Sequence, residues 1–161
     1  MNKEEYQFSY EVYNSAEELN EQDAWLVKEA RKVTDAAYAP YSNFNVGAVA
    51  KLANGKTVAG TNQENASYPV GICAERVLLS SAATLFPNIA IDTIAISYDN
   101  TRGESGHPIS PCGMCRQALA EYEERTKQPI RLLLSGLEGK VFAIKKSSSL
   151  LPLSFGSEDL K

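Results

Sequence analysis

The sequence predicts an α/β fold: a three-layer α/β/α sandwich built on a mixed sheet of about five strands. Two observations lead to this prediction. Segments of helical periodicity alternate with segments of strand length, and an Asn-Gly pair between two alternating segments indicates an antiparallel hairpin. The 161 residues fit a single domain, which at this size buries roughly 70% of the surface that the unfolded chain exposes.

The first predicted elements are an exposed strand and a long helix. Aromatic and apolar residues alternate with polar ones from Tyr6 to Val12, which favours an exposed or edge strand added to the main fold. Apolar residues then recur at helical spacing after Asn20, a good N-cap. We therefore expect a helix over Glu21–Ala37, ended by Pro40.

A hairpin and a second helix follow. Apolar residues alternate over residues 44–50, Asn54-Gly55 is a strong turn signal, and residues 57–61 form the returning strand. From Cys73 to Phe86 the apolar residues recur at helical spacing, and Pro87 closes this helix. The helix is apolar enough to be largely buried.

The second half of the chain adds three strands and one helix. Ile89–Tyr98 is rich in β-branched residues and predicts a central strand, and residues 99–110 predict a loop. Pro111 fits the first turn of a helix that continues towards Arg125. The last two strands are predicted over residues 130–135 and 141–145.

The composition disfavours several classes of partner. The chain carries 16 Lys and Arg against 20 Asp and Glu, a formal charge of -4, and it has no basic stripe, so we expect no nucleic-acid partner. No apolar run reaches the roughly 18 residues of a membrane span, so we expect no membrane partner. The first residues lack the apolar core of an export signal, and we expect a cytoplasmic protein.

Cysteine usage indicates a metal site or a catalytic site. The chain has three cysteines, Cys73, Cys112 and Cys115, an odd number that does not fit a disulfide framework. Its only histidine, His107, falls in a polar loop, where we expect a solvated side chain. Mechanisms that need a histidine pair, or a Cys-His couple, are therefore disfavoured.

The three thiols fall where two predicted helices begin. Cys73 opens one helix, and Cys112 and Cys115 open the next with their side chains on one face. The dipole at a helix N-terminus lowers a thiol pKa towards the thiolate that a metal requires. Three cysteines without a fourth leave an open position on a zinc ion, which is the catalytic pattern, and Glu75 is then well placed to move protons.

Other interpretations of these residues stay open. Any one cysteine could be a small buried hydrophobe, and Cys112 with Cys115 would also fit a redox dithiol. An acid in the first turn of a helix, such as Glu75, is commonly only a partner of the helix dipole. A noncatalytic zinc module, with a side chain in the fourth position, is a hypothesis from a different class.

The motifs around these residues resemble those of the zinc-dependent nucleoside deaminases: Cys-Ala-Glu at 73–75 and Pro-Cys-x-x-Cys at 111–115. More specifically, the chain is similar to the small homotetrameric cytidine deaminases. The stretches that match that family are 38–48, 61–68, 73–76, 111–117, 150–152, Phe155 and 157–160. The resemblance covers nearly everything from Asn20 onward. It implies a catalytic domain over residues 20–161, preceded by an N-terminal extension over residues 1–19.

The resemblance implies zinc-dependent hydrolysis of cytidine and 2'-deoxycytidine to uridine and 2'-deoxyuridine, a reaction of pyrimidine salvage. Cys73, Cys112 and Cys115 would bind one Zn²⁺ per subunit. Glu75 would take a proton from the attacking water, deliver it to N3 of the base and help to expel ammonia from C4. Arg76 would donate to the ligand sulfurs, its alternative being a surface ion pair.

The family's substrate contacts match further residues of this chain. The substrate-binding set would be Phe44, Asn62, Glu64, Ala74, Ser110 and Phe155. Asn62 and Glu64 would hold the ribose 3'-hydroxyl, and main-chain groups of Ala74 and Ser110 would bracket the base edge. Phe44 would stack on the pyrimidine, although its alternation with its neighbours would equally make it a core residue.

The resemblance also implies an assembly. Phe155 would enter the site of a neighbouring subunit, so the expected enzyme is a homotetramer with shared active sites. Among related deaminases, those acting on blasticidin S share the Gly-Met filling between the paired cysteines but lack the full Asn-x-Glu pair, and those acting on deoxycytidylate or tRNA usually have histidine in place of the first cysteine. Asn62 and Glu64 therefore favour cytidine and deoxycytidine.

Overall fold

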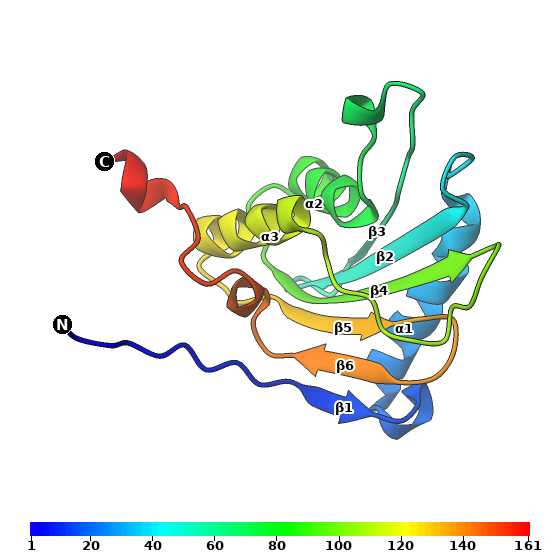
Figure 1. Cartoon of the computed structure of the whole chain (residues 1–161), viewed down its shortest axis with the longest axis horizontal. Helices are drawn as coiled ribbons and strands as arrows, with labels where there is room; N and C mark the ends of the chain where they lie inside the picture. Colours follow the sequence, from blue (N-terminus) through cyan, green and yellow to red (C-terminus); the bar gives the residue numbers. More distant parts are fainter.

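A six-stranded mixed sheet runs through the computed structural model, which describes residues 1–161 (Figure 1). The strands lie in the order β1-β6-β5-β4-β2-β3, and only β4 and β5 run parallel. Their bounds are β1 Glu11–Tyr13, β2 Phe44–Leu52, β3 Thr57–Thr61, β4 Ile91–Asn100, β5 Arg131–Ser135 and β6 Val141–Ile144. The predicted mixed sheet is confirmed, with one more strand than the five expected, because β1 pairs with β6 at the edge of the same sheet.

Helices cover both faces of this sheet, as the sequence predicted. Helices α2 (Ala74–Leu85) and α3 (Gly113–Thr126) lie over one face, and α1 (Glu21–Val33) lies over the other. The side chains of β4 alternate between the two cores: Ile94 and Ile96 pack under α2 and α3, and Ala95 packs against α1. The three layers follow directly from this alternation. No helix is both long enough and apolar enough to span a membrane.

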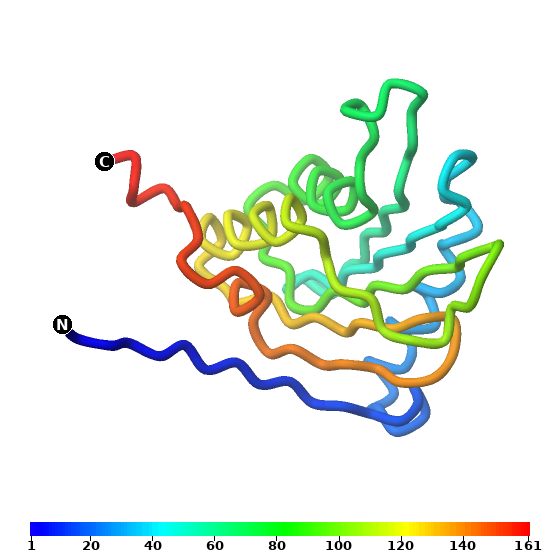
Figure 2. The backbone as a smooth tube through the Cα atoms, in the orientation of Figure 1, coloured from blue at the N-terminus to red at the C-terminus, as the bar shows by residue number.

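Two elements differ from the sequence prediction by more than two residues at one end. The α-helix that was expected to reach Ala37 ends at Val33, and residues 34–36 form a 3-10 turn in which the Thr34 hydroxyl donates to the Arg31 carbonyl (2.6 Å). The strand expected from Tyr6 is also shorter, because pairing with β6 begins only at Glu11. The first ten residues run out beyond β6 towards the side of the molecule where the C-terminus lies (Figure 2).

The topology brings the starts of α2 and α3 together. Helix α3 forms the crossover between the parallel strands β4 and β5, so the loop after β4 leads directly to the N-terminus of α3. Helix α2 lies next to α3 on the same face (Figure 1). In open α/β sheets, ligands bind outside the carboxyl ends of the strands, and this is the end of β4 at which both helices begin.

Candidate active site

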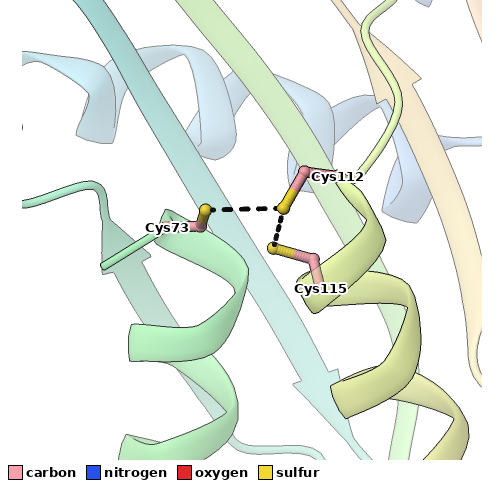
Figure 3. Close-up of side chains that lie close together, drawn as sticks. All are labelled: Cys73, Cys112 and Cys115. Atoms are coloured by element: carbon pink, nitrogen blue, oxygen red, sulfur yellow. Dashed lines mark hydrogen bonds between the residues drawn. The ribbon is translucent and has the colours of Figure 1, made fainter. Parts of the chain in front are cut away.

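The three cysteine sulfurs meet at the start of α2 and α3 (Figure 3). Cys73 is the N-cap of α2, Cys112 is the N-cap of α3, and Cys115 lies in the first turn of α3. The sulfur of Cys112 lies 3.7 Å from that of Cys73 and 3.5 Å from that of Cys115, and all three lie within 4.8 Å of one another. The structure thus brings together the three residues that the sequence singled out.

The spacing of the sulfurs fits a shared zinc ion. Ligand sulfurs about 2.3 Å from a tetrahedral zinc lie about 3.8 Å apart, close to the 3.5 and 3.7 Å between sulfurs seen here. Cys115 is fully buried, Cys73 is half-buried and Cys112 is exposed, so the cluster opens to solvent on one side. Three thiolates with an open fourth position form the donor set of a catalytic zinc site rather than a structural one.

The local electrostatics favour thiolate at Cys73. A hydrogen bond from the Cys115 thiol is the main cause that lowers the pKa of Cys73 to about 6, and the same bond raises the pKa of Cys115. The positive charge of Arg76 also lowers the pKa of Cys73. Two helix N-termini face the cluster, and their dipoles stabilise negative charge on the sulfurs.

Glu75 is buried beside the cysteine cluster, with 5% of its surface exposed. Desolvation raises the pKa of its carboxyl group, and hydrogen bonds from its own backbone N–H and from Cys115 partly offset that rise. A carboxyl group with a raised pKa binds and releases protons more readily near neutral pH. The position and environment of Glu75 therefore suit a general acid and base.

Gly60 in β3 sets the position of the first turn of α2. A Cβ atom on Gly60 would lie 2.5 Å from both the Ala74 carbonyl oxygen and the Leu78 backbone nitrogen. Only a residue without a side chain lets the helix backbone lie this close to the strand. The placement of Cys73 and Glu75 therefore depends on a glycine that lies in a different element.

Gly60→Ala is expected to lower the free energy of unfolding by about 2 to 3 kcal/mol, because two backbone segments must move apart. The shift displaces Cys73, so the zinc content of the purified protein falls too. Gly113→Ala is the matched control, since a Cβ at this first residue of α3 meets no atom within 4 Å. Urea unfolding and metal analysis compare the two variants; equal stability and equal zinc content would contradict the role of Gly60.

The side chain of Asn62 is hydrogen-bonded to the backbone at the start of β2, where Phe44 lies. The Asn62 side chain accepts a hydrogen bond from the Val46 N–H (2.7 Å) and donates one to the Phe44 carbonyl (2.9 Å). Phe44 is half-buried, and its ring stacks on that of Tyr98 at a centroid distance of 4.7 Å. Phe44 is thus neither a fully buried core residue nor a free surface aromatic.

Glu64 lines a separate small cavity of about 200 Å³. Its carboxylate accepts hydrogen bonds from the Tyr41 N–H (2.9 Å) and the Ser42 N–H (3.3 Å). A hydrogen bond from the Ser42 hydroxyl is the main cause that lowers the pKa of Glu64. The rings of Tyr41 and Tyr68 meet edge to face across this cavity. Neither was among the predicted substrate-binding residues, although both fall within the stretches that carried the family resemblance.

Four predicted site residues remain to be placed: Ala74, Ser110, Arg76 and Phe155. Ala74 begins α2, where the first N–H groups have no partner within the helix. Ser110 is exposed in the loop two residues before Cys112. Arg76 is half-buried and forms no hydrogen bond to a cysteine sulfur. Phe155 is 60% exposed in the C-terminal segment, its carbonyl accepts a hydrogen bond from Gln117 (2.9 Å), and it lines a pocket with Glu124 and Lys127 at the C-terminal end of α3.

Residues 20–128 match the model of the cytidine and deoxycytidylate deaminase zinc-binding region. The chain belongs to this family. The matched region contains all three cysteines and Glu75, so every residue of the cluster lies within it.

Several cytidine deaminases are similar to this chain over most of their own length. A cytidine deaminase of Halalkalibacterium halodurans is 37% identical over 135 residues, which cover 84% of this chain and 95% of the relative. A cytidine deaminase of Mycoplasma genitalium is 41% identical over 104 residues, covering 64% and 75% of the two chains. The crystal structure of cytidine deaminase from Burkholderia pseudomallei is 36% identical, with a TM-score of 0.72 over 85% of this chain and 100% of that one.

Proposed function

We propose that this chain is a zinc-dependent cytidine deaminase, which hydrolyses cytidine and 2'-deoxycytidine to uridine and 2'-deoxyuridine. The observation that carries the proposal is the cluster of Cys73, Cys112 and Cys115 beside the buried Glu75, at the N-termini of two adjacent helices. Two relatives that bear the name cytidine deaminase, similar over 95% and 75% of their length, support the choice of substrate.

The reaction needs a proton carrier, and Glu75 is the proposed one. Water adds at C4 of the pyrimidine and ammonia leaves from the same carbon, so cytidine and water give uridine and ammonia. Zinc, when bound by the three thiolates, supplies a Lewis acid that makes water a strong nucleophile near neutral pH. Glu75 takes one proton from the attacking water and passes it to N3 of the base, then takes the remaining proton of the hydroxyl added at C4 and delivers it to the amino group, which leaves as ammonia.

Main-chain and side-chain groups around the cluster would orient the nucleoside. The Ala74 N–H at the start of α2 and the Ser110 carbonyl before α3 lie on the two segments that carry the zinc ligands, which suits contacts with the two sides of the base edge. Asn62 keeps one N–H and one lone pair free after its two backbone bonds, so it can still bind a ribose hydroxyl together with Glu64.

The proposal includes a shared active site in a homotetramer. Phe155 is exposed and lines a pocket with Glu124 and Lys127 at the C-terminal end of α3, a position that suits insertion into the site of a neighbouring subunit. Such an enzyme would act in pyrimidine salvage. A cytoplasmic location is part of the proposal, because three reduced thiols are maintained most readily there.

An absorbance assay on zinc-loaded protein tests this function. Cytidine, deoxycytidine, cytidine monophosphate and blasticidin S are compared at equal concentrations, with light scattering to determine the mass of the assembly. We expect turnover of both nucleosides, little or no turnover of the monophosphate or blasticidin S, and the mass of four chains. Turnover of blasticidin S alone would overturn the substrate assignment, and a fully active monomer would overturn the shared site.

A further inference from the structure

Tyr98, near the end of β4, contacts two separate parts of the candidate site. Its side chain is fully buried, its ring stacks on Phe44 with an interplanar angle of 16°, and its hydroxyl lies 2.9 Å from Nδ1 of His107. The Tyr98 and His107 rings also meet edge to face at 5.5 Å. The sequence motifs of the site contain neither residue, and the chemistry proposed above uses neither.

His107 lies in the loop that leads from β4 to Cys112. The first part of this loop is bound to neighbouring elements: the Asn100 N–H donates to the Ser105 hydroxyl (2.8 Å), and the Leu137 N–H donates to the Ser105 carbonyl (2.8 Å). From residue 106 to residue 110 the contact between Tyr98 and His107 is the only hydrogen bond. The path of the chain up to Ser110 therefore depends on that bond, on the close backbone packing of residues 105–107 against Gly136 and Gly139, and on the apolar packing of Ile109 against the core.

The bond between Tyr98 and His107 survives a change of protonation. In the tautomer with its proton on Nε2, His107 accepts from the Tyr98 hydroxyl at Nδ1. In the imidazolium form Nδ1 donates to the phenol oxygen, and the hydroxyl proton can turn towards the Glu104 carbonyl, 3.5 Å away. The pair is thus suited to holding the loop in place, and a proton-transfer role is not required.

The ring of Tyr98 also packs against the ring of Phe44. Tyr98 lies opposite Val46 in the β2–β4 pairing, so its ring lies on the sheet face that carries α2 and α3, under the ring of Phe44. The Phe44 backbone is fixed by Asn62, and the stack on Tyr98 limits the plane of its ring. One buried side chain therefore constrains both an aromatic beside the site and the loop before a zinc ligand.

We infer that Tyr98 and His107 are positioning residues for deamination. The Tyr98 hydroxyl and His107 hold residues 106–110, so that the Ser110 carbonyl and Cys112 keep their places, and the Tyr98 ring orients Phe44 towards the base. This inference rests on the proposed function. Tyr98 and His107 would affect the reaction only through Phe44, Ser110 and Cys112. The Tyr98 hydroxyl would hold the loop, and the Tyr98 ring would orient Phe44.

Five variants separate these two roles in the zinc-loaded protein. Tyr98→Phe and His107→Ala each remove the bond and are expected to lower kcat for cytidine about 10-fold with little change in KM, since misplacement of a group near the reacting atoms slows the chemical step. Their double variant should be no slower than either single variant, because both remove the same bond. His107→Asn can place an amide near the position of Nδ1 and should restore most of kcat. Tyr98→Leu should also raise KM, because it removes the stack.

Arg102→Ala, an exposed residue of the same loop, is the control and should match wild type. Zinc content and melting temperature are measured for every variant. Amide hydrogen exchange at Leu137 and Arg116, whose N–H groups donate to the Ser105 and Cys112 carbonyls on either side of residues 106–111, is measured on the same samples and should be faster in Tyr98→Phe and His107→Ala than in wild type. The exchange result holds whether or not cytidine is turned over.

Kinetics within twofold of wild type in both single variants would overturn the inference, and so would additive losses in the double variant or unchanged exchange at Leu137 and Arg116. Failure of the proposed function is distinguishable, because it would appear as absence of cytidine turnover in the wild-type protein itself. In that case faster exchange alone would reduce the pair to a structural contact and overturn its role in deamination.

Discussion

Replacing Glu75 with glutamine is expected to lower kcat for cytidine by about 1,000-fold while the protein stays folded and keeps its zinc. The barrier rises by about 4 kcal/mol in that case. Glutamine has nearly the volume of glutamate and fits the same buried place, but its amide cannot accept a proton from water and return it to the base. Steady-state kinetics and metal analysis of the same preparation give the two readouts.

A matched control tests whether the loss of activity in Glu75→Gln comes from lost proton transfer or only from the loss of a negative charge at a helix N-terminus. Glu21 also lies in the first turn of a helix, at the start of α1, but it is exposed. Glu21→Gln removes the same charge from a helix N-terminus and should leave kcat unchanged. If Glu75→Gln loses zinc together with activity, Glu75 is a ligand and its assignment as proton carrier is wrong. An unchanged kcat would exclude Glu75 from the chemistry altogether.

The parts of this protein that could be predicted from sequence are those that depend on neighbouring residues. The Asn54-Gly55 turn predicted the hairpin, and Gly55 has the positive φ of 79° that such turns require. Cys73 and Cys112 were predicted at helix starts, and both are N-caps. Their sulfurs converge because α2 and α3 cover the same face of the sheet. The alternation of helices and strands predicted the three layers but not which helices share a face.

Pairing partners distant in sequence were harder to predict. Alternation over residues 6–12 indicated a strand, but alternation says nothing about the partner or the length of pairing. The partner is β6, and pairing is confined to Glu11–Tyr13. Strand β4 runs to Asn100, two residues past its predicted end, because its last residues pair with Asn45 and Phe44 in β2.

Polar residues with tertiary partners were the hardest to interpret. Glu123 lies in a run of charged residues on α3, yet only 6% of it is exposed, and its Oε1 accepts from the backbone N–H groups of Ile130 (2.8 Å) and Ser147 (2.9 Å). His107 was expected to be solvated; its ring is exposed but bonded to the buried Tyr98. No local pattern distinguishes such residues from surface ones, because their partners come from other elements.

Cys112→Ala is expected to lower the affinity for zinc by about 1,000-fold or more and to abolish deamination, because it removes one of three protein ligands. This cysteine gives the clearest test of the cluster because its side chain is exposed. Truncating an exposed side chain that has no other role changes stability by only about 0.5 kcal/mol. Any larger loss in this variant therefore comes from the metal site and not from packing, which could not be said of the buried Cys115.

Thermal unfolding with and without a chelator measures whether bound zinc stabilises the wild type and the Cys112→Ala variant. Zinc present at 1,000 times its dissociation constant stabilises the folded state by about 4 kcal/mol. A chelator should therefore lower the melting temperature of the wild type but leave that of Cys112→Ala unchanged. Met114→Ala, which truncates an exposed neighbour in the same helical turn, should respond to the chelator as the wild type does. A Cys112→Ala variant that binds one zinc per chain and responds to the chelator would contradict the three-cysteine site, because two sulfurs and another side chain would then suffice to hold the metal.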